Sequence, residues 1–209
     1  MNIMAPTLSR PDVDQDAPSD ESLMQRYAAG DAQAFDCLFA RHRKSVLAFI
    51  RGFVTESDEA EDMLQTVFMR VIRYRKRYRP SAKFTTWLYA ITRSVCIDAQ
   101  RKKRHHNQHI ANNQSGRDME FQQDDLAASA KTPTPRETYQ QTQWQSALQE
   151  ALQELTTEQR EVVLLRQTTA MTYAEIGELL GCAENTVKSR MYYGLLNLRR
   201  ILEQRGISL

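Results

Sequence analysis

The stretch YAEIGELLGCAENTVKSRMYYGLLNLRR, residues 173–200, decides the fold of the C-terminal part of the chain. Apolar side chains recur at helical spacing on both sides of Gly181 and Cys182, which predicts two helices joined by a short turn. Gly181 is expected to end the first helix, and a joint of three to four residues that contains Gly is the form expected of a helix-turn-helix. The pattern fits a helix-turn-helix that presents a DNA-reading helix, and it also fits two packed helices joined by a bend.

The second of these helices is expected from Glu184 to Glu203, with polar side chains on the face opposite the expected core. The first residues of a recognition helix reach base edges in the major groove, where Lys pairs with guanine and Asn with adenine. Arg190 is better placed for a phosphate. The core face is expected to contain Val187, Met191, Leu195, Leu198 and Leu202. The outward face is expected to contain Glu184, Asn185, Lys188, Ser189 and Tyr192.

The composition of the 209 residues is typical of a helical protein. Of these residues 41% are hydrophobic and 26% are charged, and only seven Gly and six Pro are present, which disfavours a sandwich or barrel with many turns. The length suits two small domains. We therefore predict an all-α fold with two small helical domains.

The cysteines and the N-terminal residues argue against several further classes of protein. Cys37, Cys96 and Cys182 lie far apart and form no Cys-x-x-Cys pair, so we expect three small core side chains rather than a disulfide framework or a zinc site. No run of about 18 apolar residues occurs, and the first residues lack the apolar segment of a signal peptide. We therefore expect a cytoplasmic protein.

Composition and periodicity divide the chain into four segments. Residues 1–19 are predicted to be a disordered tail, 20–104 a four-helix domain, 105–140 a flexible linker and 141–205 a second four-helix domain. In the first domain we expect helices over 20–30 and 31–54, from Thr55 or Ser57 to Arg79, and over 85–104. In the second we expect helices over 142–155, 157–169, 172–180 and 184–203.

Caps are predicted at the starts of three helices. Asp31 is the expected N-cap of the second helix. Thr156 with Gln159, and Thr172 with Glu175, have the spacing of capping boxes.

Residues 70–104 carry twelve basic side chains and a single acid, Asp98, although the whole chain has a net charge of only +2. Cations can hold a phosphate backbone while aromatic faces accept unstacked bases, so the segment suits single-stranded or melting DNA. Alternatively, Phe84 and Trp87 are core residues beneath a solvated basic face. The interleaved aromatic residues are Tyr74, Tyr78, Phe84, Trp87 and Tyr89.

The sequence contains no pattern of catalytic residues, such as a glycine-rich phosphate loop or a His-Glu-x-x-His motif. His105, His106 and His109 have no carboxylate or thiol at ligand spacing, so we expect a solvated tract and no metal site. We predict a protein that is not an enzyme and needs no cofactor.

Taken in order, three motifs resemble bacterial RNA polymerase sigma factors of the extracytoplasmic-function (ECF) type. These are DMLQ at 62–65, TTWLYAITRSVCIDAQRKKR at 85–104 and TVKSR at 186–190. With the first two helices, the resemblance covers about five-sixths of the chain. It departs from the family at Ser94, where Asn is frequent, at Asn185, where Gly is common, and at Tyr193, where a base is frequent. The resemblance therefore implies the function and leaves the promoter sequence open.

The resemblance implies that 20–104 is a sigma region 2 domain, which binds the polymerase clamp and recognises and melts the −10 element. It implies that 141–205 is a sigma region 4 domain, which binds the polymerase flap and reads the −35 element. The residues that match the clamp-binding positions are Asp62, Leu64, Gln65 and Phe68. Those that match the −10 positions are Arg77, Lys83, Phe84, Thr85, Trp87, Arg93, Ser94, Arg101 and Lys102. Those that match the −35 positions are Glu184, Asn185, Thr186, Lys188, Ser189, Arg190, Tyr192 and Tyr193.

The partners that the resemblance implies are core RNA polymerase, promoter DNA and an anti-sigma factor. It also implies a role in a stress response, and we expect the free protein to be a monomer. The 36-residue linker would span about 30–36 Å as a coil and about 120 Å if extended. Two promoter elements lie roughly 70 Å apart, so the linker must stretch on DNA. In the free chain we expect domains that are mobile or packed together, and a packed state would hide both DNA-facing surfaces.

Two rival interpretations remain. A stand-alone helix-turn-helix regulator would explain 173–200 but leaves the first domain without a role. A helical adaptor that binds only protein is disfavoured by the strongly basic segment.

Overall fold

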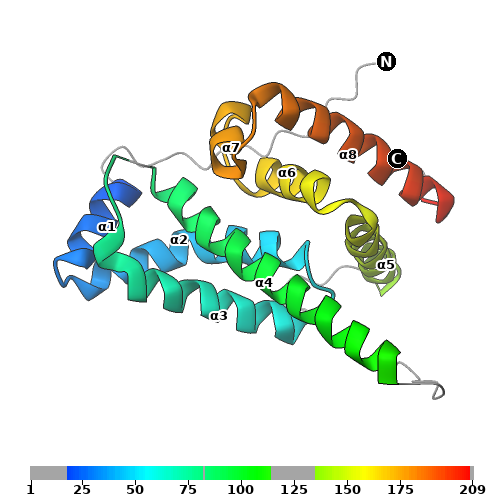
Figure 1. Ribbon diagram of the computed structural model, residues 1–209, viewed down its shortest axis with the longest axis horizontal. Helices are drawn as coiled ribbons and strands as arrows, with labels where there is room; N and C mark the ends of the chain where they lie inside the picture. The colour runs from blue at the N-terminus through cyan, green and yellow to red at the C-terminus, as the bar shows by residue number, and fades with distance from the viewer. Residues whose placement is uncertain (1–17, 82, 114–134, 208–209) are drawn as a thin grey trace.

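The computed structural model describes residues 18–81, 83–113 and 135–207, and all regular secondary structure in these ranges is helical (Figure 1). The all-α prediction is confirmed. The helices are α1 (Asp20–Ala28), α2 (Ala32–Arg51), α3 (Ser57–Tyr74), the 3₁₀ turn η1 (Arg75–Arg77), α4 (Phe84–Asn113), α5 (Pro135–Glu154), α6 (Thr157–Thr168), α7 (Tyr173–Leu180) and α8 (Glu184–Gln204). Helices α1–α4 form an N-terminal unit and α5–α8 a C-terminal unit.

Side-chain caps fix the starts of several helices. Asp31 Oδ1 accepts a hydrogen bond from the Ala34 amide (3.3 Å), as predicted. At α7 both bonds of the predicted capping box form, between Thr172 and Glu175. At α6 the box is incomplete, because Thr156 accepts from the Gln159 amide while the Gln159 side chain bonds Asn197 of α8. The three predicted N-cap positions are therefore confirmed, whereas the predicted bond that the Gln159 side chain would close is wrong.

The core of the N-terminal unit lies between α2, α3 and α4. Apolar side chains at helical spacing are buried there, among them Leu38 and Ile50 of α2 and Val67 of α3. Helix α3 ends at Tyr74 rather than Arg79, since the chain tightens into η1 and buries Tyr78 beside α4.

The segment expected as a linker is shorter than predicted. Helix α4 continues to Asn113, and α5 begins at Pro135, so 105–113 and 135–140 are helical. No Gly or Pro interrupts 84–113, and each further residue extends a formed helix at little cost. Proline at the first helical position of α5 is favourable because its missing N–H has no helical partner there. Residues 1–17 of the tail predicted over 1–19, and the rest of the linker, lie outside the described residues.

In the C-terminal unit, α7, the turn and α8 form the predicted helix-turn-helix. Gly181 has φ +68°, in the left-handed region, and the Cys182 amide donates to the Gly177 carbonyl (2.9 Å). Ile176 and Val187 are fully buried where the two helices pack. Helix α8 begins at Glu184 without a side-chain cap, because Ala183 stands at the N-cap.

Leu195, which was expected on the core face of the last helix, is 44% exposed instead. At α8 the physical reason is a close helix approach, since Gly194, not Leu195, faces α6. A Cβ on Gly194 would lie 3.0 Å from Val163 Cγ2.

The two units pack against each other, with α6 on α2 and α7 on α4 (Figure 1). The side chain of Leu164 on α6 occupies the space beside Gly52 at the end of α2, where a Cβ would lie 2.3 Å from Leu164 Cδ1. Of the two arrangements expected for the free chain, this is the packed one.

The cysteines do not all lie in the core. Cys96 is buried and Cys182 half-buried, but Cys37 on α2 is exposed, so that part of the prediction was wrong. A period of 3.6 places Cys37 one residue off the buried stripe that contains Leu38.

Among the described residues, no helix combines the length and apolar character that a bilayer crossing requires. In the same part of the chain, no cluster of His, Cys, Asp and Glu could hold a metal ion. The side chains of His106 and His109 lie outside the described residues.

Candidate polymerase and nucleic-acid interfaces

A groove of about 400 Å³ runs between α2 and α3 and brings together three of the four predicted polymerase-binding residues. Gln65 is exposed at the groove, whereas Leu64 and Phe68 are nearly buried and form its floor. Asp62 is exposed one turn earlier on α3 and does not line the groove. The groove therefore combines an apolar floor with a polar rim.

Sequence reasoning missed other residues of this groove. Met69 is 59% exposed, although it is a large apolar side chain. Phe35 and Phe39 of α2 line the same groove, and the Phe39 ring meets the Phe68 ring edge-on at 4.7 Å. With buried Leu38, the two phenylalanines give α2 a broad apolar face, and this width is the signal in the sequence that could have revealed them.

The start of α4 is anchored from α1, because Glu21 Oε1 accepts a hydrogen bond from the Phe84 amide (2.9 Å). Phe84 itself is fully buried, so its ring is not available to a base, and its assignment as a DNA contact is corrected to a core role. Trp87 is half-buried and packs on Tyr78, with 5.4 Å between ring centroids. Burial also raises the pKa of Tyr78, with the nearby Glu21 adding to the shift.

The predicted −10 residues divide into exposed and engaged groups. Arg77 and Lys102 are exposed. Ser94 is exposed and accepts a hydrogen bond from Arg70 Nη1 (3.2 Å). By contrast, Arg93 pairs with a carboxylate of the C-terminal unit, and so does Lys83.

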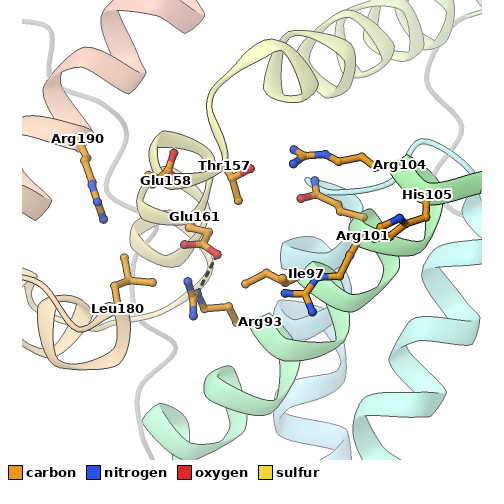
Figure 2. Close-up of a pocket in the computed structure, with 11 residues that line it drawn as sticks. Arg93, Ile97, Arg101, Arg104, His105, Thr157, Glu158, Glu161, Leu180 and Arg190 are labelled. Carbon is orange, nitrogen blue, oxygen red and sulfur yellow. Dashed lines mark hydrogen bonds and ion pairs between the residues drawn. The ribbon is translucent and has the colours of Figure 1, made fainter. Parts of the chain in front are cut away.

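The Arg93 pair lies in a cleft of about 620 Å³ between the two units (Figure 2). Arg93 Nε donates to Glu161 Oε1 (2.8 Å), and the Glu161 side chain is only 2% exposed. Burial raises the pKa of Glu161, and the hydrogen bond from Arg93 opposes that shift. Figure 2 shows Arg101 and Arg104 of α4 on one side of the pair and Arg190 of α8 on the other. The cleft thus joins predicted −10 residues to a predicted −35 residue.

The predicted −35 face of α8 remains open. Tyr192 is 65% exposed, and its ring meets that of exposed Tyr193 at 5.3 Å. Lys188 pairs with Glu184 (2.7 Å) one turn earlier on the same helix. Glu184, Asn185, Lys188 and Ser189 are exposed, Thr186 is half-buried, and Arg190 turns inward so that its Nη1 lies 3.7 Å from Cys182 Sγ. The expectation that a packed state hides both DNA-facing surfaces is therefore wrong for α8.

Both halves of the chain match models of one family. Residues 38–106 match sigma-70 region 2, and residues 145–198 match sigma-70 region 4. The RNA polymerase sigma factor CarQ of Myxococcus xanthus is 32% identical over 179 residues, which cover 86% of this chain and 95% of that protein. The ECF RNA polymerase sigma factor SigE of Mycolicibacterium smegmatis is also 32% identical, over 91% of this chain and 72% of that protein.

The chain belongs to the ECF RNA polymerase sigma factors.

As a member of this family, the chain is a transcription initiation factor with a region 2 domain and a region 4 domain. Two solved structures share its fold. CnrH, solved in complex with the cytosolic domain of CnrY, superposes with a TM-score of 0.64 at 21% identity, over 90% of this chain and 99% of CnrH. The sigma factor RpoE of Bartonella quintana, solved with the anti-sigma factor NepR, gives 0.61 at 20% identity, over 82% and 98%.

Proposed function

We propose that this chain binds core RNA polymerase through the α2–α3 groove and directs initiation by two DNA contacts, one on each unit. Residues 20–104 recognise and melt the −10 element, and 141–205 read the −35 element. Support comes from one observation above all: a basic α4 and an exposed reading face on α8 belong to the same two-domain frame. The chain acts by binding rather than by catalysis, in the cytoplasm where bacterial polymerase works.

In the clamp contact, Gln65 and Asp62 supply polar groups beside an apolar floor. Met69 adds an exposed apolar side chain that a partner helix can cover. An apolar centre with a polar rim is typical of protein interfaces in which a few residues carry most of the affinity.

In the −10 contact, basic side chains on α4 and just before it hold phosphates, while half-buried Trp87 stacks on a flipped or unstacked nucleobase. The basic residues we assign are Arg77 in η1, Lys83 before α4, and Arg93, Arg101 and Lys102 on α4, with the hydroxyls of Thr85 and Ser94. Phe84 supports Trp87 from beneath, at 6.0 Å between ring centroids.

In the −35 contact, Asn185, Lys188 and Ser189 lie on the first turns of α8, which enter the major groove. Glu184 and half-buried Thr186 flank them, and the exposed rings of Tyr192 and Tyr193 follow one turn later. Arg190 reaches a phosphate once it is released from the cleft between the units.

Run-off transcription with purified core polymerase tests the proposal. We expect promoter-specific transcripts only when the chain is present, and no gain in promoter specificity would refute the sigma role. Binding of the chain to duplex promoter without polymerase, with no effect on initiation, would favour the stand-alone regulator instead.

A sharper test addresses the clamp contact. Replacing Asp62 and Gln65 by Ala should weaken core binding by about tenfold, because Gln65 lies at the groove and Asp62 is exposed one turn earlier on the same helix. The matched control replaces Glu178 and Gln167, which are exposed on the C-terminal unit, by Ala and should bind core normally. Equal affinities for the two double variants would argue against the clamp assignment.

We also propose that an anti-sigma factor holds the chain inactive. The two solved relatives in fold were determined with CnrY and with the anti-sigma factor NepR. A purified candidate that co-elutes with the chain should abolish run-off transcription at one equivalent, and unchanged transcription would exclude that candidate.

A further inference from the structure

The contact between the two units uses residues that the proposed function assigns to −10 DNA. Arg93 pairs with Glu161 of α6, and Lys83 pairs with Glu175 of α7. Thr85 lines a second cleft between the units, which also contains Lys83 and Glu175. In both pairs the N-terminal unit supplies the cation and the C-terminal unit supplies the carboxylate. The carboxylates therefore stand where phosphates of melted DNA would otherwise pair.

The contact between the two units consists of specific hydrogen bonds and close side-chain packing. Gln149 Nε2 donates to the Val54 carbonyl (2.7 Å), and Gln153 Nε2 donates to the Gly52 carbonyl (3.1 Å). These side chains of α5 satisfy carbonyl groups at the end of α2, which has no further helical turn to pair with them. Leu164 fills the space that the missing side chain of Gly52 leaves.

The strongest element of the contact is the pair between Arg93 and Glu161. Because the Glu161 side chain is 2% exposed, its charge is almost removed from water and depends on Arg93 for compensation. While the units are packed, Arg93 Nε is bonded to Glu161 and its charge is partly neutralised, so this donor is not available to a DNA phosphate. Packing of the units therefore competes with binding of Arg93 to DNA.

We propose that the C-terminal unit is an internal inhibitor of the −10 contact: Glu161 and Glu175 occupy Arg93 and Lys83 until the units separate. This inference rests on the proposed function, which assigns α4 to DNA. The packed arrangement of the two units, which we call the closed state, belongs to the free chain and does not depend on that assignment. The exposed residues on the reading face of α8 can meet duplex DNA in the closed state, whereas the −10 contact and the phosphate contact of Arg190 require opening.

Energy transfer between two dyes on the full-length chain measures closure without polymerase. One dye is placed on exposed Cys37 of α2, and the other on a cysteine introduced at exposed Gln204 of α8, with Cys182→Ser to prevent extra labelling. The unmodified interface should give a single population with the transfer efficiency of the closed arrangement. The double variant Glu161→Gln, Glu175→Gln should raise the open-to-closed ratio by about tenfold, because the charge on the acceptor is lost from both pairs.

These substitutions leave the fold of the C-terminal unit intact. Gln at position 175 can still accept the Thr172 amide in the capping box. Neutral Gln at position 161 has a smaller desolvation cost than a buried carboxylate. Gly52→Ala provides a second perturbation from the other unit, since its Cβ pushes against Leu164 and alters no charge. The charge-matched control is Glu178→Gln, an exposed residue of α7 outside the contact.

Run-off transcription at limiting amounts of chain gives the functional readout. The double variant and Gly52→Ala should reach half-maximal transcription at a several-fold lower concentration than the control. The proposal is overturned if the unmodified chain is already open, or if the variants open it without improving initiation. If the unmodified chain supports no promoter-specific transcription, the proposed function fails, whereas the dye measurement still decides whether the ion pairs hold the chain closed.

Discussion

Gly177 on α7 offers a severe test of how tightly the helix-turn-helix is built. A Cβ at this position would lie 2.7 Å from the carbonyl oxygen of Cys182, which is backbone and cannot rotate away. Ordinary carbon–oxygen contacts begin at about 3.3 Å. The turn must therefore move away from the new Cβ by about 0.6 Å. Overpacking of this kind costs about 1–3 kcal/mol. The shift also strains the hydrogen bond from the Cys182 amide to the Gly177 carbonyl, worth about 1 kcal/mol.

Replacing Gly by Ala in a helix gains about 1 kcal/mol of helix propensity, which offsets part of this cost. We therefore expect Gly177→Ala to lower the free energy of unfolding of the C-terminal unit by about 1–3 kcal/mol. In urea, monitored by circular dichroism, this corresponds to a midpoint shift of about 1 M. Hydrogen exchange should become about tenfold faster or more in peptides from α7 and the turn. Affinity for −35 duplex DNA should fall as well, because the turn positions the start of α8.

The matched control is Gly194→Ala on α8, where the nearest atom is a side-chain methyl, Val163 Cγ2, at 3.0 Å. A methyl group can yield by a small rotation, so the cost should stay below about 1 kcal/mol. If Gly177→Ala is as stable as the unchanged chain, or more stable, helix propensity alone governs the site and the argument from close approach is refuted.

Three further predictions concern other parts of the chain. Gly181→Ala should cost about 1–2 kcal/mol in urea unfolding, because φ +68° is left-handed and open space around the site cannot relieve that strain; an unchanged midpoint would contradict this. Burial raises the pKa of Asp20, but the hydrogen bond from His42 and further cationic contacts outweigh it, so the folded pKa lies below the usual value of an aspartate. This stabilisation is complete above the unfolded pKa and is lost as pH falls through the folded one, so Asp20→Asn should destabilise the chain near neutral pH and flatten the acid limb of its stability curve. Finally, a maleimide at pH 8 should modify exposed Cys37 well before Cys96, whose thiol pKa is raised by burial; equal rates, read by mass spectrometry, would show that the core opens readily.

The helices could be predicted from sequence because their signals are local. Apolar spacing, the cap at Asp31 and the box at Thr172 each involve residues within one or two turns, and each is found in the structure. The errors occurred where a distant neighbour decided the outcome. Gln159 bonds Asn197 on α8 instead of closing a capping box, and Gly194 rather than Leu195 faces α6.

The sequence could predict which segments form the candidate site, but it could not predict which of their side chains are buried or paired. The sequence indicated the basic α4 and the outward face of α8, and the exposure of Tyr192 agrees with that prediction. It assigned Phe84 to DNA, because an aromatic residue between bases has the same pattern whether it stacks on a nucleotide or packs in a core. Only its complete burial distinguishes the two roles.

By itself, the sequence determined an all-α chain with two helices joined at Gly181 and a concentrated basic segment at 70–104, since each follows from residue type and short-range spacing. Tertiary structure alone decided which charges are engaged. Arg93 and Glu161 are 68 residues apart in the chain, and nothing local indicates that they meet. A cation in a sequence is equally suited to a phosphate or a carboxylate, and the packing of α6 and α7 against the N-terminal unit selects the carboxylate in the free protein.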